Sequence, residues 1–398
     1  MAAQREEDLD DPATVESIVR GILRQVTGRN DDDIDAGREL KDMGVDSLMN
    51  IHMMRKAEQA FGVEMSIRAL SQTKTAGGPL TIRWFVDQIL ALRRGVGGDP
   101  EATQESADVA VVAERVEHDA ASLASHQALL GARIPIETST ITLSSGARIE
   151  VLCAGTGAPL VLLCPIMASI PVWVCQIEAF WRDHRVIALN YPGYGRSTDT
   201  PAAMSPGALA RLLAVVLDAL GVHEAVHLVG WSMGGMIAQE FGLSWPQRVR
   251  SIALVSTTSH LEEADTIANM EDLFRGLRED LERDTPEPAM VARRKRALDM
   301  SRREAGPERS FGYMAEVLRF DVRQRIRGLR PPTLVVQGLE DTLAAPRHGR
   351  YMWQEIPGAE HHGFAACGHF APLHVPSAFN ELLRDFVRRC SSSDPPDQ

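Results

Sequence analysis

The sequence LVGWSMGGM, residues 228–236, is the clearest indication of the fold, and in it Ser232 stands between Gly230 and Gly234 in the pattern G-x-S-x-G. The run before the serine is apolar and typical of a buried strand, and the run after it is typical of a helix. A strand that turns sharply into a helix leaves no room for side chains two residues to either side of the serine. The pattern therefore predicts a tight turn that presents the Ser232 hydroxyl above the edge of a sheet.

The same turn predicts a set of reacting groups. At the start of a helix, the backbone N–H of Met233 would point at a negative charge that develops beside the serine. A serine nucleophile also needs a base, and the base needs an acid that orients it. Asp341 follows a predicted strand, and His369 lies between a glycine-containing turn and a helix start. Their order along the chain predicts a triad of Ser232, Asp341 and His369.

Each partner of Ser232 also has a simpler interpretation or a rival. Taken alone, Asp341 is a turn-forming aspartate and His369 is a surface histidine. Glu340 is adjacent to Asp341 and is the alternative acid. The alternative bases lack a Gly–His loop and are His361, His362 and His374. The joint spacing favours Asp341 and His369.

Short apolar runs, mostly rich in β-branched residues, recur after residue 138, and helical stretches separate most of them. They are PLVLLC (159–164), RVIALN (185–190), AVHLVG (225–230), RSIALVS (250–256) and PTLVVQG (332–338). Such alternation is typical of a mostly parallel sheet buried on both faces, an α/β fold. Two earlier runs predict a hairpin around residues 144–146. Charged helical sequence at about 260–325 predicts a helical cap.

The N-terminal part is typical of an all-helical domain. Apolar residues recur at the helical period in 13–28, a second helix is predicted from Asp46–Ser47 to Gly62, and a third lies in 80–94. Residues 97–137 begin with Gly, Pro and Ser and hold more acidic than basic side chains, which predicts a linker. The expected domains are thus 1–96, a linker at 97–137, and 138–390.

The composition supports two globular domains and excludes several classes of function. A chain of 398 residues is longer than one typical core needs. The net charge of -12 argues against a nucleic-acid partner. Five cysteines fit neither a disulfide framework nor a zinc site, so no metal is expected. The acidic N-terminus does not resemble a signal peptide, and no apolar run reaches about 18 residues, which predicts a cytoplasmic protein without a membrane span.

With these motifs in place, residues 138–388 resemble the α/β-hydrolases. NYPGYGRST resembles a signature of that family, although Asn190 stands where aspartate is common. Cys164-Pro165 stands where such enzymes usually have His-Gly. The resemblance implies a second oxyanion donor in that loop, and Pro165 has no N–H to offer. The expected donor is therefore the backbone N–H of Ile166.

The N-terminal part resembles the acyl and peptidyl carrier proteins of polyketide and nonribosomal peptide synthases. The matching residues are Leu40, Gly44, Asp46, Ser47, Leu48, Ile51, Glu58, Phe61 and Gly62. The resemblance implies a four-helix bundle in which Ser47 carries 4'-phosphopantetheine, whose thiol holds an acyl or peptidyl group. A simpler interpretation is that Asp46 or Ser47 only caps a helix.

That resemblance also implies partners. A phosphopantetheinyl transferase would modify Ser47, and upstream synthase modules or an acyl-loading enzyme would supply the cargo. Many carriers have acidic residues along the helix after the serine, whereas this chain has His52, Arg55 and Lys56. The choice of partner therefore cannot be copied from acidic carriers.

Together the two resemblances imply a thioesterase that works on its own carrier domain in polyketide or nonribosomal peptide biosynthesis. Ser232 would attack the thioester held at Ser47, with His369 as the base and Asp341 as its orienting acid. Two alternatives stay open. One is an acyltransferase or cyclase that passes the acyl group to an amine or alcohol. The other is an ester hydrolase that uses the carrier-like part only for docking.

Overall fold

A computed structural model describes the protein over residues 9–27, 34–43, 45, 47–63, 65, 79–94, 112–198, 204–261 and 287–392. The chain forms two compact units, Met1–Val109 and Ala110–Gln398. Within the described ranges, no helix has both the length and the apolar character needed to cross a membrane.

The N-terminal unit is helical, as predicted. Its described elements are α2 (Pro12–Thr27), the 3-10 helix η2 (Leu40–Met43), α3 (Ser47–Phe61) and α5 (Ile82–Arg93). Helix α3 ends at Gly62, whose φ of 62° is a left-handed conformation that favours glycine. Helix α5 begins after Thr81, whose hydroxyl accepts the N–H of Trp84 at 3.1 Å. Residues 66–78 lie outside the described residues, and so does any fourth helix of the expected bundle that falls there.

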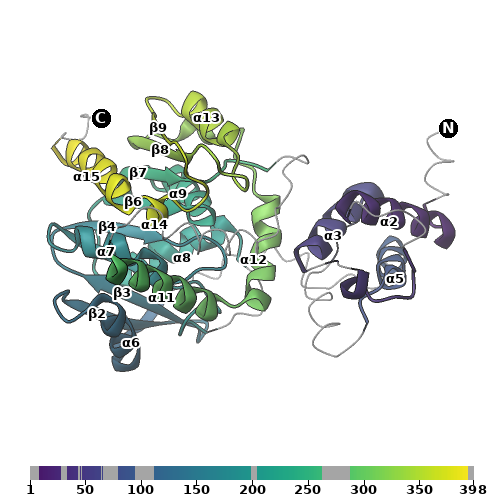
Figure 1. Ribbon diagram of the computed structural model, residues 1–398, viewed down its shortest axis with the longest axis horizontal. Helices are drawn as coiled ribbons and strands as arrows, with labels where there is room; N and C mark the ends of the chain where they lie inside the picture. The colour runs from purple at the N-terminus through teal and green to yellow at the C-terminus, as the bar shows by residue number, and fades with distance from the viewer. Residues whose placement is uncertain are drawn as a thin grey trace. The chain divides into compact units, whose positions relative to one another are not determined.

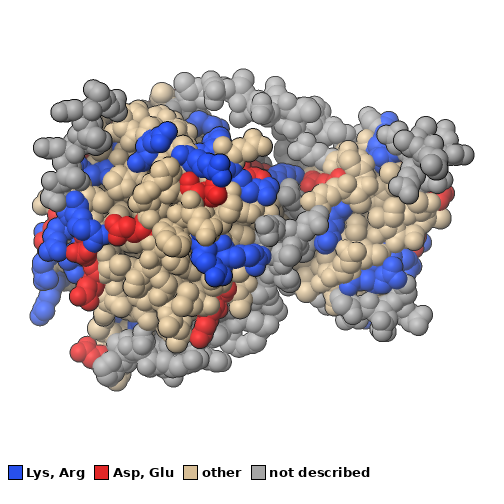
Figure 2. Space-filling model, turned by 90° about the horizontal axis from the view of Figure 1, so that it is seen from above, with Lys and Arg blue, Asp and Glu red and all other residues tan. Residues whose placement is uncertain are grey.

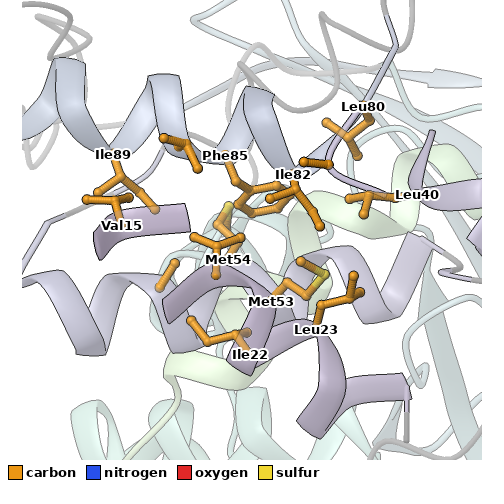
Figure 3. Close-up of a cluster of buried hydrophobic side chains, with 14 of the residues drawn as sticks. Val15, Ile22, Leu23, Leu40, Met53, Met54, Leu80, Ile82, Phe85 and Ile89 are labelled. Atoms are coloured by element: carbon orange, nitrogen blue, oxygen red, sulfur yellow. The ribbon is translucent and has the colours of Figure 1, made fainter. Parts of the chain in front are cut away.

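One hydrophobic core holds these helices together (Figure 3). Its fully buried members include Val15, Leu23, Met53, Phe85 and Ile89. The backbone N–H of Leu40 also donates to the carbonyl oxygen of Leu80 at 2.8 Å, which joins η2 to the segment before α5. These contacts fix η2 relative to α5.

The C-terminal unit is built on a sheet whose nine described strands follow the order β1-β2-β3-β5-β4-β6-β7-β8-β9. The strands are β1 (Ala113–His118), β2 (Ile136–Leu143), β3 (Arg148–Ala154), β4 (Ala158–Leu163), β5 (His184–Leu189), β6 (Val226–Trp231), β7 (Val249–Val255), β8 (Thr333–Gly338) and β9 (Glu360–Phe364). Strands β4 to β9 run parallel, while β1 to β3 pair antiparallel. The predicted mostly parallel sheet and the β2–β3 hairpin are confirmed, and β9 is an additional strand.

Helices cover both faces of the sheet, with α7 and α15 in front of it and α9 behind it in Figure 1. The described helices of this unit are α6 (Ala120–Leu130), η3 (Ile170–Trp173), α7 (Val174–Phe180), α8 (Pro206–Ala219), α9 (Met233–Ser244), η4 (Pro246–Arg248), α11 (Pro288–Ala305), α12 (Pro307–Arg319), η5 (Ile326–Gly328), α13 (Pro346–Glu355), α14 (Ala371–His374) and α15 (Pro376–Ser392). Helices α11 and α12 lie in the range predicted for the cap. Residues 262–286 of that range lie outside the described residues.

The cap helix α11 carries a run of basic side chains. Arg293 pairs with Glu178, and the buried Arg294 donates to the carbonyl oxygen of Leu373 at 2.7 Å. Arg293 and Arg294 therefore hold the cap helix to the rest of the unit. On the face shown in Figure 2, Lys and Arg are interspersed with Asp, Glu and neutral residues.

The structure departs from the predicted linker at 97–137, because β1 and α6 lie inside that range. Strand β1 pairs with β2 at the edge of the sheet, and five of its six side chains are exposed. Charged, exposed side chains are common on edge strands, so AERVEH lacks the apolar alternation that identifies inner strands. Helix α6 is capped by Asp119, whose carboxylate accepts the N–H of Ser122 and pairs with Arg196 at 2.8 Å.

A buried histidine makes this unit sensitive to acid. His227 on β6 lies between two hydroxyl groups, with Nδ1 at 2.7 Å from Ser251 Oγ and Nε2 at 3.1 Å from Ser391 Oγ. Burial, with smaller contributions from His184 and Arg250, lowers the pKa of His227 to about 4. His227 is therefore neutral in the folded protein at neutral pH.

We expect the free energy of unfolding to fall by about 3 kcal/mol between pH ~6.5 and pH ~4 because of His227. The unfolded chain takes up a proton at the ordinary histidine pKa, whereas the folded chain resists protonation until the pH is lower. The stability is thus complete above pH ~6.5 and is lost as the pH falls. Urea unfolding of the full chain, followed by tryptophan fluorescence, should show most of this slope removed in His227→Gln.

The matched control is His223→Gln, since His223 is exposed. This variant should keep the pH dependence of the wild type. Equal slopes for both variants would contradict the role given to His227.

Candidate active site

Ser232 occupies a strained turn between β6 and α9. Its φ of 54° and ψ of -118° lie in a region that residues other than glycine rarely adopt. Two bonds from β7 and the residues after it hold this backbone. The N–H of Ser232 donates to the carbonyl oxygen of Val255 at 2.9 Å, and Thr257 Oγ1 donates to the Ser232 carbonyl oxygen at 2.6 Å. The predicted strand–turn–helix geometry is confirmed.

The glycines around the serine are required by close packing. A Cβ atom on Gly234 would lie 2.1 Å from the carbonyl oxygen of Leu163 on β4. A Cβ atom on Gly230 would lie 2.4 Å from the carbonyl oxygen of Gly234. Both distances are well below van der Waals contact, so larger residues would push α9 away from the sheet. This packing sets the N-terminus of α9, which begins at Met233, beside Ser232.

Asp341 follows β8, and its carboxylate is buried. Oδ1 accepts the backbone N–H groups of Leu343 and Ala344, both at 2.9 Å. Oδ2 accepts from Gln337 Nε2 at 3.1 Å and lies 2.9 Å from His369 Nδ1. Three donors from its own loop and strand therefore fix the carboxylate in the orientation that meets the imidazole.

His369 lies in the loop between β9 and α14 and is also buried. Its carbonyl oxygen accepts the indole N–H of Trp231 at 2.8 Å, which joins this loop to the end of β6. Because Asp341 engages Nδ1, Nε2 is the nitrogen left to exchange a proton with a nucleophile. The alternative acid, Glu340, is exposed. One alternative base, His361, stacks on the Trp353 ring at a centroid distance of 5.6 Å.

Ser232 and His369 line one pocket, and most of its other described walls are apolar. The remaining lining residues are Ile166, Met236, Ser256, Thr257, Thr258, Leu261, Met314, Val317, Leu343 and Ala344. Met314 and Val317 come from the cap helix α12. Cap residues carry no motif, so sequence reasoning missed them. Only the fold brings them over the serine.

Ile166, the predicted second oxyanion donor, lies in the loop after β4 and lines this pocket. Two tyrosine hydroxyl groups form hydrogen bonds with this loop, one on each side of Ile166. Tyr194 accepts the N–H of Met167 at 3.2 Å, and Tyr191 donates to the carbonyl oxygen of Cys164 at 2.9 Å. Burial raises the pKa of the Cys164 thiol far above its usual range, which leaves it an inert packing residue.

In the N-terminal unit, Ser47 is the first residue of α3, a helix of 15 residues. The first N–H groups of a helix have no acceptor within it, and the helix dipole favours negative charge there. This position therefore fits a serine that carries a phosphodiester. Asp46, which was predicted together with Ser47, lies outside the described residues.

Comparisons with protein families match both parts of the chain. Residues 17–78 match the model of the phosphopantetheine attachment site, and residues 158–290 match that of the alpha/beta hydrolase fold. The first match includes Ser47, and the second includes Ser232 and Ile166. An attachment domain of this kind implies a covalently bound 4'-phosphopantetheine.

Individual relatives agree. The chain is 32% identical over 262 residues to the polyketide synthase ThaQ of Burkholderia thailandensis. This match covers 62% of this chain but only 12% of ThaQ. It is 30% identical to a 2-hydroxy-6-oxononadienedioate/2-hydroxy-6-oxononatrienedioate hydrolase of Burkholderia vietnamiensis, over 54% of this chain and 80% of that enzyme. A crystal structure of a hydrolase from Pseudomonas aeruginosa matches with a TM-score of 0.54 at 26% identity, over 63% of this chain and 98% of that one. The chain thus belongs to the α/β-hydrolase family and carries a phosphopantetheine carrier domain.

We expect Asp341→Asn to lower kcat for a p-nitrophenyl ester by about 10³- to 10⁴-fold, with KM nearly unchanged. The amide would keep the shape of the carboxylate but would no longer select the imidazole tautomer that accepts the serine proton. Steady-state kinetics on the purified full chain measure both constants.

Glu340→Gln is the matched control, because it makes the adjacent and equivalent change on an exposed side chain. Its kcat should stay within about twofold of the wild type, since surface changes seldom perturb a site. Equal losses in the two variants would show that Asp341 does not orient His369.

Proposed function

We propose that this protein is a thioesterase-type serine hydrolase that releases the acyl or peptidyl chain carried on its own phosphopantetheine domain. Two observations carry the proposal: His369 Nδ1 lies 2.9 Å from Asp341 Oδ2, and His369 lines the same pocket as Ser232. A phosphopantetheine attachment site precedes that pocket in the same chain. The likeness to ThaQ supports a place in polyketide biosynthesis.

Acylation of the enzyme uses three side chains. When bound, the arm on Ser47 would supply the thiol that holds the acyl group as a thioester. Ser232 Oγ bonds to the thioester carbonyl carbon while His369 Nε2 takes the hydroxyl proton. Asp341 keeps the imidazole oriented and stabilises its positive charge. As the carbon–sulfur bond breaks, His369 would return the proton to the departing thiolate.

The negative charge on the carbonyl oxygen needs donors that are already in place. We assign these to the backbone N–H groups of Met233, at the start of α9, and of Ile166, in the loop after β4. Water then attacks the acyl-serine while His369 takes its proton. The bond between the acyl carbon and Ser232 Oγ breaks, His369 returns the proton to Oγ, and the free acid leaves. The proposed partners are a phosphopantetheinyl transferase that modifies Ser47 and the synthase modules or acyl-loading enzyme that supply the chain.

Intact-mass measurements on acyl-loaded protein test this function. The chain is loaded with a phosphopantetheinyl transferase and an acyl-coenzyme A, and the mass is followed over time. The wild type should gain the arm and lose the acyl group, while Ser232→Ala should keep the acyl group at least about 10³-fold longer. Ser47→Ala should gain no arm.

Two results would contradict the proposal. A Ser47→Ala protein that still gains the arm would show that Ser47 is not the attachment residue. Equal loss of the acyl group from the wild type and Ser232→Ala would remove the coupled reaction. The released product separates hydrolysis, which gives a free acid, from transfer to an amine or alcohol.

The pocket walls predict a preference for uncharged acyl chains. Among its described lining residues, His369 is the one titratable side chain, and the others are apolar or carry hydroxyl groups. A terminal carboxylate would lose its hydration there without gaining an opposite charge. We expect kcat/KM for a hexanoyl thioester of N-acetylcysteamine to exceed that for the adipoyl thioester by about 10²-fold.

Met314→Lys places a cation on the pocket wall formed by α12, and it should narrow this ratio at least about tenfold. Steady-state kinetics with both thioesters measure the ratio. Comparable turnover of the two thioesters by the wild type would contradict the preference.

A further inference from the structure

A buried carboxylate and amide lie behind the oxyanion loop, residues 164–170. Glu150 on β3 and Asn190 in the turn after β5 are each only 1% exposed, far from the usual place of such side chains. We propose that this pair positions the loop, and with it the Ile166 N–H that receives the oxyanion. The inference rests on the proposed function, and it assigns positioning residues that touch no substrate.

Asn190 connects the sheet to the loop through both ends of its amide. Nδ2 donates to Glu150 Oε2 at 2.7 Å, and Oδ1 accepts the backbone N–H of Ile170 at 2.9 Å. Ile170 begins η3, four residues after Ile166. A buried amide with both ends bonded has one favourable orientation, so Ile170 is held at a fixed distance from β3.

Glu150 is held as firmly as its partner. Its Oε2 also accepts the backbone N–H of Arg196 at 2.8 Å, and its Oε1 accepts the hydroxyl of Ser122 on α6. A Cβ atom on Gly195 would lie 2.1 Å from Asn190 Nδ2 and 2.5 Å from Glu150 Oε2, so the turn passes directly over the pair. The carboxylate thus meets three donors and needs Asn190 as one of them.

This arrangement gives a physical reason for asparagine at position 190. An aspartate could still accept the N–H of Ile170, but its second oxygen would face Glu150 Oε2. Two carboxylates at that distance cannot both be ionised without a large cost in a buried site. The amide supplies the donor that Glu150 requires and keeps the acceptor that the loop requires.

The cap holds the same loop from another side. The N–H of Ser169 donates to Ser301 Oγ at 2.7 Å, and its hydroxyl donates to Glu304 Oε2 at 2.5 Å, both on α11. The loop is therefore fixed between the sheet and the cap. A displacement of about 1 Å in such a group can cost about 10²-fold in rate.

Labelling by a fluorophosphonate probe tests the inference on the full chain. The probe reacts once with the serine nucleophile and places its own oxygen in the oxyanion hole. Intact mass then gives both the labelling rate constant and the final labelled fraction. We expect Asn190→Asp to label about 10²-fold more slowly than the wild type, yet to reach the same final fraction.

Two further variants sharpen the result. Glu150→Gln should label within about threefold of the wild type, because an amide oxygen still accepts from Asn190 and Arg196. Combining Asn190→Asp with Glu150→Gln should recover at least about tenfold of the lost rate, since one of the facing charges is removed. Ser251→Ala is the control for a buried hydrogen bond elsewhere in the sheet, and it should label like the wild type.

Three outcomes would overturn the inference. One is an Asn190→Asp protein that labels at the wild-type rate. Another is a lower final fraction with an unchanged rate constant, which would show that the pair serves folding alone. The third is a double variant no faster than Asn190→Asp. A wild type that does not label at Ser232 would instead remove the serine centre itself, and this inference with it.

Discussion

The close approach of Gly234 to the Leu163 carbonyl oxygen is the contact on which the active site depends. A Cβ atom would come within 2.1 Å of that oxygen, so helix α9 begins directly against β4. Strand β4 leads into the oxyanion loop, and β6 leads into Ser232. The proposed nucleophile Ser232 and both proposed oxyanion donors, Met233 and Ile166, are therefore positioned by the same packing. Any residue larger than glycine would separate them.

Both proposed functional serines stand at the start of a helix, but under different constraints. Ser47 is the first residue of α3, where a helix N-terminus favours a phosphate. Ser232 precedes α9 in a strained, left-handed backbone conformation. Hydrogen bonds with Val255 and Thr257 stabilise this conformation. The N-terminus of a helix would thus favour the permanent phosphate in one domain and the proposed transient oxyanion in the other.

Local signals made much of this architecture predictable. Glycines at fixed spacing identified the turn at Ser232, and chain order selected Asp341 and His369. The rest depends on contacts between distant segments. Glu150 and Asn190 are 40 positions apart in the sequence but form a hydrogen bond, and no periodicity in the sequence predicts such a pair. Strand β1 escaped prediction because an exposed edge strand needs no apolar face, so its sequence is similar to that of a charged linker.

In the proposed mechanism, cargo held at Ser47 passes through Ser232. Rapid quenching of acyl-loaded protein, followed by peptide mass mapping with an isotopically labelled acyl group, tests it most directly. The label should leave the peptide that contains Ser47, appear on the peptide that contains Ser232, and then enter solution. Loss of the label to solution at the full rate, without passage through the Ser232 peptide, would contradict this route.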